Sequence, residues 1–255
     1  MGTSGCRRHR WAQSTMILYA NGCSHTAAAE AVVPDGFAKD NGREGIDRRP
    51  HPLNLAASWC TRLAEHLGAE LVCDAESASS NDRILRTTQK WLDTATDLAG
   101  TLVVIQWTTW EREEWLHNGT HYQVNASGVD WVPKDLRLRY KEYVANHDYW
   151  AKTREWYKKI WDLHVELADK KVTHLFYNGW STFSDIPDKK DFGKNYLGPY
   201  DRSLSYNSVL VNNGFEWVTP NSYHFDAKGH CFWAKYLLQY IKQHNLVTTD
   251  AISTN

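Results

Sequence analysis

The sequence is poor in cysteine, lacks any long apolar run and has no excess of charge of either sign. Five cysteines among 255 residues, with no CxxC pair, are too few for a disulfide framework and argue against a structural zinc site. The apolar runs are short, and Thr101–Trp107 is typical of them, so none spans a bilayer. Lys and Arg number 29 against 30 Asp and Glu, so the chain has no net positive charge that would attract nucleic acid or an anionic membrane. These absences indicate a globular protein with free thiols, expected in the cytoplasm or on a virion.

Aromatic residues are abundant, with 13 Trp and 13 Tyr. Their rings suit sugar stacking, protein interfaces and ordinary cores alike, so composition leaves all three open. No repeat or Pro/Gly/Ser-rich linker divides the chain. We therefore expect a polar N-terminal arm at 1–15, one α/β domain at 16–246 with an aromatic-rich insertion around 107–133, and a C-terminal tail at 247–255.

Short β-rich runs alternate with longer helical stretches. The predicted strands are Met16–Ala20, Ala69–Cys73, Thr101–Trp107, Val172–Tyr177 and Phe215–Val218. Helices are predicted from Asn54, from about Asn81, from about Leu136 to Asp169, and after a cap at Asp226. This alternation predicts a three-layer α/β/α sandwich around a parallel sheet of about five strands, with any site at the carboxyl ends of the strands.

Two short segments, near the two ends of the chain, combine residues suited to nucleophilic catalysis. Gly22-Cys23-Ser24 follows the first predicted strand, where a serine on a tight turn is well placed to attack a substrate. Asn221-Ser222-Tyr223-His224 precedes the last helix, and a histidine there could take the proton of Ser24. Cys23 is the alternative nucleophile.

In this pairing the chain resembles the SGNH (GDSL-type) hydrolases, whose first block is Gly-Asp-Ser and whose last is Asp-x-x-His. The family's second and third blocks are similar to 77–83 and 106–112 here, and the whole looks like a divergent branch found in tailed-phage genomes. The resemblance implies a flavodoxin-like fold and ester hydrolysis by Ser24 and His224, with no metal and no cofactor. It also implies an oxyanion hole formed by the N–H of Ser24 and by residues of the second block, namely Ser79, Ser80 and Asn81.

The chain departs from the family in two places. Asn221 stands where the family has Asp, so the third catalytic residue is either Asn221, which can orient His224 only through its carbonyl oxygen, or a carboxylate such as Asp226. The third block has Thr108 and Thr109 where the family has its oxyanion Asn, a role that Asn81 could fill.

Residues that follow the predicted strand ends are candidates for substrate binding. They are Trp107, Thr108, Trp110, Arg112 and Arg83, with Trp115 and Trp180 in nearby loops. The tryptophans favour an acylated carbohydrate or a small ester as the partner. The two arginines either hold a polar or anionic substrate group or pair with Asp82 and Glu111.

Two functions from other classes compete with the esterase. One is an inactive SGNH fold that serves as a glycan-binding or virion-associated module. The other is an interaction protein whose Trp-rich insertion contacts a phage structural partner or a second copy of the chain.

Overall fold

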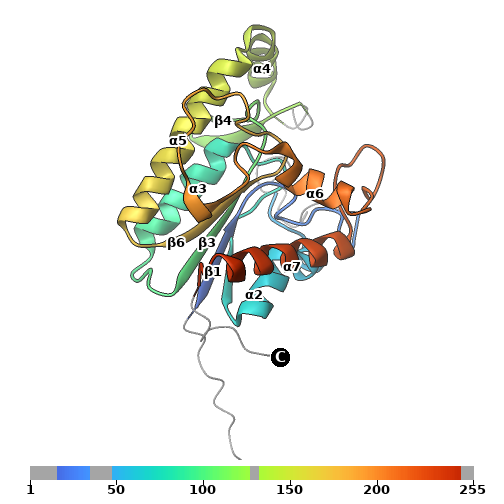
Figure 1. Ribbon diagram of the computed structural model, residues 1–255. Helices are drawn as coiled ribbons and strands as arrows, with labels where there is room; N and C mark the ends of the chain where they lie inside the picture. The colour runs from blue at the N-terminus through green and yellow to red at the C-terminus, as the bar shows by residue number, and fades with distance from the viewer. Residues whose placement is uncertain (1–15, 35–47, 127–131, 248–255) are drawn as a thin grey trace, which may run out of the picture.

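The computed structural model describes residues 16–34, 48–126 and 132–247. A central five-stranded sheet carries helices on both faces, with α3 and α5 on one side and α2 and α7 on the other (Figure 1). The expected three-layer α/β/α sandwich is therefore confirmed. The arm at 1–15 and most of the tail at 247–255 lie outside the described residues.

The sheet is parallel and has the strand order β2-β1-β3-β6-β7. Its strands are β1 (Ile17–Asn21), β2 (Glu70–Cys73), β3 (Thr101–Trp107), β6 (Thr173–Asn178) and β7 (Tyr196–Leu197). All seven residues of β3 are buried, because helices cover both faces of this central strand. The chain order reverses between β1 and β3, and in flavodoxin-like sheets this switch point is where a ligand crevice opens.

Two apolar cores flank the sheet. One packs side chains of α2 (Trp59–Leu67), α6 (Tyr206–Asn212) and α7 (Ala227–Gln243) against one face. The other packs α3 (Asn81–Thr94) and α5 (Tyr149–Asp169) against the opposite face. The short helix α1 (Pro52–Ala57) precedes α2 and is separated from it at Ser58, which caps α2. The two cores fix the layers that carry the site.

The aromatic-rich insertion contains a β-hairpin that the sequence analysis missed. Strands β4 (Glu113–His117) and β5 (Thr120–Val124) pair antiparallel around Asn118-Gly119, both with positive φ. This dipeptide is the preferred turn for two-residue hairpins. The hairpin packs on α4 (Lys134–Asn146) through a small third core beyond the carboxyl ends of the strands.

Two other predictions were wrong. Phe215–Val218 is not a sheet strand: Trp217 makes only an isolated bridge to Phe225, and the fifth strand is β7. The long helix from Leu136 to Asp169 is two helices, since α4 ends at Asn146 and α5 starts after Asp148, whose carboxylate accepts the N–H of Ala151.

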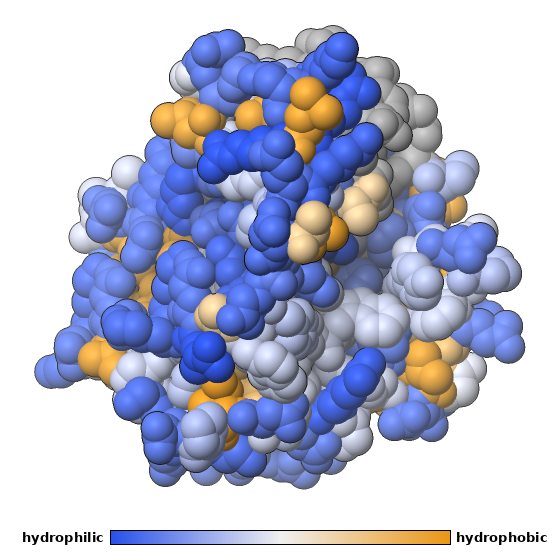
Figure 2. Space-filling model, turned by 90° about the horizontal axis from the view of Figure 1, so that it is seen from above, coloured by the Kyte–Doolittle hydropathy of each residue, from blue (hydrophilic) through white to orange (hydrophobic). Residues whose placement is uncertain are grey.

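Figure 2 looks down on the molecule from above, the side on which α4 lies in Figure 1. Apolar residues form separate orange spots among blue polar ones on this face. Within the described parts of the chain, no helix is both long and apolar enough to cross a membrane.

Candidate active site

Ser24 lies in a tight turn directly after β1. Gly22 opens this turn, where a Cβ would lie only 2.3 Å from Thr26 Oγ1, so no larger residue fits. The turn closes through the N–H groups of Thr26 and Ala27, which both donate to the carbonyl of Cys23. Thr26 Oγ1 also donates to Gln106 Oε1 at 2.9 Å, which fixes the turn to β3.

His224 lies just before α7, and its imidazole has a carboxylate partner. Nδ1 of His224 lies 2.9 Å from Glu30 Oε2, across 194 residues of chain. Burial lowers the pKa of His224, and the neighbouring Glu30 carboxylate raises it in part. The N–H of Ala227 donates to the carbonyl of Ala31, so the segment of Glu30 and the segment of His224 are also joined by their backbones.

Backbone conformations of positive φ cluster around this pair. Glu30 has φ 66° and Tyr223, beside His224, has φ 58°, while Ala28 and Ala78 have φ 54° and 65°. For residues with a Cβ this region costs about 1–2 kcal/mol each. Such strain is concentrated at functional sites, where side chains are held in a defined orientation, and this is consistent with a functional role for Glu30 and His224.

Ser24, Glu30 and His224 line one cavity of about 1190 Å³. Its wall also includes Ala78, Arg48 and Arg112. A second cavity of about 550 Å³ adjoins it, and the two share Thr109, Arg112, Trp180 and Tyr223. The site is therefore an open crevice at the carboxyl end of β1, with an extension along α5.

Among the described residues no hydrogen bond joins Ser24 to His224. The hydroxyl of Ser24 instead points at Cys23 Sγ, 4.0 Å away. Cys23 itself is buried, receives a hydrogen bond from Gln106 Nε2 at 3.3 Å and does not line the cavity. The alternative of a thiol nucleophile therefore has no route to a substrate.

His25 is buried but also lines the cavity of Ser24 and His224. Its ring stacks on Tyr206 with centroids 5.0 Å apart and meets His224 edge-on at 5.7 Å. Burial holds the pKa of His25 well below its usual range, and the positive charges of His224 and Arg112 lower it further. His25 is therefore a second, neutral imidazole on the cavity wall.

The structure gives His224 a different partner from the two that the sequence analysis named. Asn221 lines the cavity, but no hydrogen bond joins it to His224 in the described structure. The carboxylate of Asp226 accepts the N–H groups of Lys228 and Gly229 and is thus used as the cap of α7. Glu30 holds the position instead. Glu30 is the single charged residue among the small or apolar residues of 26–33. This isolated charge was the feature of the sequence that could have indicated a functional role.

Ser79, Ser80 and Asn81, the residues expected in the oxyanion hole, are buried, and none of them lines the cavity. The N–H of Ser80 donates to Gln123 Oε1 at 2.8 Å, and that of Ser79 donates to the carbonyl of Glu76. The Asn81 amide bonds both backbone groups of Thr108, donating at 3.1 Å and accepting at 2.9 Å. These bonds join the three residues to the surrounding structure, and Asn81 ties α3 to the end of β3.

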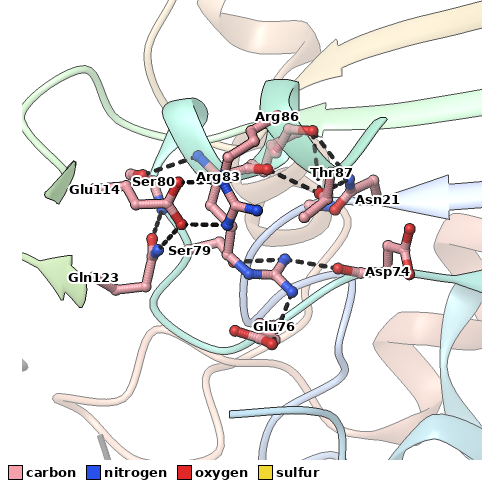
Figure 3. A network of polar contacts seen from close by, with 12 residues as sticks. Asn21, Asp74, Glu76, Ser79, Ser80, Arg83, Arg86, Thr87, Glu114 and Gln123 are labelled. Carbon is pink, nitrogen blue, oxygen red and sulfur yellow. Dashed lines mark hydrogen bonds and ion pairs between the residues drawn. The ribbon is translucent and has the colours of Figure 1, made fainter. Parts of the chain in front are cut away.

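Arg83 belongs to the same structural network (Figure 3). Its guanidinium pairs with Glu76 at 2.7 Å and donates to the carbonyl of Asp74 and to Ser79 Oγ. In the same view Glu114 holds Arg86 through two bonds of 2.6 Å and also accepts from Gln123 Nε2. Arg83 therefore supports the base of α3 and does not reach the cavity.

Of the remaining candidates for substrate binding, Arg112 and Trp180 line the cavities. Trp107 and Trp110 are fully buried in the core between the sheet and α5, and Trp110 stacks on Phe183 with centroids 4.8 Å apart. Thr108 is buried with its backbone on Asn81. The sequence pattern could not distinguish these core rings from Trp180, which is the tryptophan on the cavity wall.

A protein-family model matches residues 47–174 and is described as a family of unknown function, DUF6071. The match covers half of the chain. The chain belongs to this family. No curated protein matches the sequence of this DUF6071 chain. The matched segment includes Arg48 and Arg112 on the cavity wall but stops short of Ser24 and Glu30 on one side and His224 on the other.

Solved structures similar to the DUF6071 chain include three hydrolase folds. One is a protein of Desulfitobacterium hafniense DCB-2 described as lipolytic and of the G-D-S-L family (11% identity, TM-score 0.41, 88% of this chain and 99% of that one). Another is an acetyl xylan esterase of Butyrivibrio proteoclasticus (12% identity, TM-score 0.43, 90% of this chain and 64% of that one). The third is a carbohydrate esterase family 2 enzyme with a carbohydrate-binding domain from Corynascus thermopiles (Myceliophthora fergusii; 13% identity, TM-score 0.37, 91% and 67%).

In the described parts of the chain, no group of three or more His, Cys, Asp or Glu side chains could hold a metal ion.

Proposed function

We propose that this DUF6071 chain is a serine ester hydrolase in which Ser24 is the nucleophile, His224 the general base and Glu30 the residue that orients the histidine. The observation that carries the proposal is the 2.9 Å contact of Glu30 Oε2 with His224 Nδ1 on the wall of the cavity that Ser24 lines. This contact leaves Nε2 of the imidazole available for a proton. The SGNH-like first and last sequence blocks provide the nucleophile and the base.

The reaction proceeds in two acyl-transfer steps. The Oγ of Ser24 bonds to the ester carbonyl carbon while its proton moves to His224 Nε2, and the C–O bond breaks as Nε2 gives that proton to the alcohol. Water then attacks the acyl-enzyme with His224 again as base, which releases the carboxylic acid. The hydroxyl of Ser24 must rotate away from Cys23 toward His224, and catalytic hydrogen bonds commonly tighten only with substrate bound.

Two backbone N–H groups are the proposed oxyanion donors. Those of Ser24 and Ala78 have no acceptor among the described residues, and both residues line the cavity. The positive φ of Ala78 sets its peptide apart from those of its neighbours Ser77 and Ser79, whose N–H groups are bonded to backbone carbonyls. A preorganised donor of this kind is worth about 10²–10³ in rate.

The acyl acceptor in this proposal is a sugar that stacks on Trp180 and Tyr223. Both rings line the Ser24 cavity and the adjoining one, and they meet edge-on with centroids 5.7 Å apart. A Trp180→Ala variant should hydrolyse an acetylated glycan with a raised KM while hydrolysing a small phenyl ester as the parent does. Equal KM values for the glycan would remove the stacking role.

Labelling with a fluorophosphonate tests the nucleophile and its base. We expect the parent and an Asn221→Ala variant to be labelled, and Ser24→Ala and His224→Ala to remain unlabelled. Cys23→Ala serves as the matched control for the neighbouring side chain and should be labelled like the parent. Labelling that survives in Ser24→Ala would assign the reactive group elsewhere and refute the proposal.

One observation favours a second candidate, a binding module without catalysis. Ser24 and His224 share no hydrogen bond in the described structure, although the cavity between them is open and not filled by side chains. A folded parent protein that takes no label between about pH 6 and 9 would favour this module over the hydrolase.

A further inference from the structure

We infer that Arg48 and Arg112 form an anion-binding subsite beside Ser24, and that the ester accepted there carries a carboxylate or phosphate group. The inference of an anionic ester rests on the proposed hydrolase, whereas the anion subsite stands on the two arginines alone. Both side chains line the cavity of Ser24 and His224.

Arg48 is a buried cation with unpaired N–H groups. Only 5% of the residue is exposed, and its Nε and Nη2 atoms are buried without a hydrogen-bond acceptor among the described residues. Burial lowers the pKa of this guanidinium. Its backbone is held in place, since its carbonyl accepts the N–H of Ser77 at 3.0 Å. A buried guanidinium with unpaired N–H groups is destabilising unless a ligand satisfies it.

Arg112 brings a second guanidinium to the same cavity. Among the described residues, its hydrogen bond is from Nη1 to the carbonyl of Ser79, at a long 3.4 Å, and no carboxylate pairs with it. Both guanidiniums line the same cavity, and the charge of Arg112 lowers the pKa of Arg48. An anion between them would relieve this repulsion.

Arg83 shows how the same residue type looks when it has a structural role. It is buried close to the other two, and its guanidinium is satisfied by the Glu76 carboxylate, the Asp74 carbonyl and Ser79 Oγ. Glu76 is the acidic group that raises the pKa of Arg48, but its ion pair is with Arg83. Of these two buried arginines, the one with structural partners is Arg83, and the one with unpaired N–H groups is Arg48, which lines the cavity.

The other charges of this cavity are Lys141, Glu30 and Glu111. Glu30 is held by His224, which leaves Glu111 as the carboxylate that could compete with an anionic ligand. One oxygen of Glu111 is buried without a partner, and neither arginine forms an ion pair with it in the described structure. Two guanidiniums present paired N–H donors, the arrangement that binds carboxylate and phosphate with two bonds each.

Binding of simple anions tests the subsite without catalysis. A Ser24→Ala protein is titrated calorimetrically with inorganic phosphate and with succinate at low salt. Arg48→Gln and Arg112→Gln added to this background should each weaken binding by about 10- to 100-fold, the loss of a charge-assisted pair. Lys141→Gln is the control for positive charge at the rim and should change binding by less than about 2-fold. Glu111→Gln should tighten it.

The two probes also separate the sources of the charge. Tighter binding of phosphate than of succinate assigns a phosphate-bearing ester, and the reverse assigns a carboxylate-bearing one. Anion affinities that are unchanged in Arg112→Gln, which sits on the more open part of the wall, would overturn the subsite even if Arg48→Gln failed to fold. Absence of binding for both probes would overturn it as well.

A pair of esters connects the subsite to the reaction. The parent should hydrolyse 4-carboxyphenyl acetate with a kcat/KM at least about 10-fold above that for phenyl acetate, and Arg112→Gln should remove this preference. Equal rates for the two esters would refute the anionic substrate while leaving the hydrolase intact. Anion binding without hydrolysis of either ester would refute the hydrolase and leave the subsite intact.

Discussion

Replacing Glu30 by Gln removes the charge next to His224 and keeps the shape of the side chain. The charge centres of the pair are about 4 Å apart, which at an effective dielectric constant of about 20 corresponds to about 4 kcal/mol of attraction for the imidazolium. The two side chains remain 20% and 26% exposed, so solvent screening reduces this to about 2–3 kcal/mol. At about 1.4 kcal/mol per factor of ten, kcat/KM should fall by about 30- to 150-fold.

The pH profile gives the result a specific signature. Burial lowers the pKa of His224 and Glu30 raises it, so loss of the Glu30 charge must lower that pKa further. The base is then deprotonated at lower pH, and the acid limb of kcat/KM should move to lower pH while the plateau falls. A defect of folding alone would lower the plateau without moving the limb.

The assay is hydrolysis of a chromogenic ester between about pH 4 and 8 by the parent, Glu30→Gln and Asp226→Asn. Asp226→Asn makes the same chemical change at the rival carboxylate. Because Asn caps a helix about as well as Asp, this variant should keep the cap of α7 and nearly all of its stability, and it should leave the acid limb in place. If Asp226→Asn shifted the limb and Glu30→Gln did not, the assignment of Glu30 would be refuted.

The remaining predictions concern stability. Asn81→Ala should lower the free energy of unfolding in urea by about 2–4 kcal/mol, because it leaves both backbone groups of Thr108 buried and unpaired, and a loss under 1 kcal/mol would contradict this. Trp110→Ala should cost about 3–5 kcal/mol by opening a core cavity, and its KM should match the parent's. Burial lowers the pKa of His230 to about 3, so the unfolded chain binds the extra proton between about pH 3 and 6.5. Stability should therefore decrease with falling pH in that window by up to about 1.4 kcal/mol per pH unit from this residue, and a His230→Gln variant should lack that component.

The fold was largely predictable because the inner strands β1, β3 and β6 are buried on both faces. Continuous apolar runs predicted β1, β2, β3 and β6, and a helix cap was correctly placed at Asp226. The prediction failed where signals were short or local. β7 has two residues, too few for any pattern, and the Asn118-Gly119 turn was not recognised in a stretch of mixed polarity.

The candidate site was predictable only in part. Ser24 and His224 were identified from their motifs and both line the cavity, while their catalytic roles remain predictions. Glu30 was missed because no local sequence pattern indicates where its side chain points. Its contact with His224 depends on the positive φ of Ala28 and Glu30 and on a chain segment almost two hundred residues away. The sequence could not show that Ser79, Ser80 and Asn81 lie away from the cavity, because buried polar residues that join elements look, in sequence, like residues that bind substrate.

The hydrogen bond from the N–H of Ala227 to the carbonyl of Ala31 has a consequence for the order of events during folding. It closes almost the whole domain into one loop, and contacts of such long sequence separation form late in folding. Nucleophile and carboxylate lie six residues apart on one turn, but the base arrives only when the last helix docks. During refolding, reactivity toward the fluorophosphonate should therefore appear after the helical circular dichroism signal. The rate of labelling would then report when the last helix docks against the N-terminal segment.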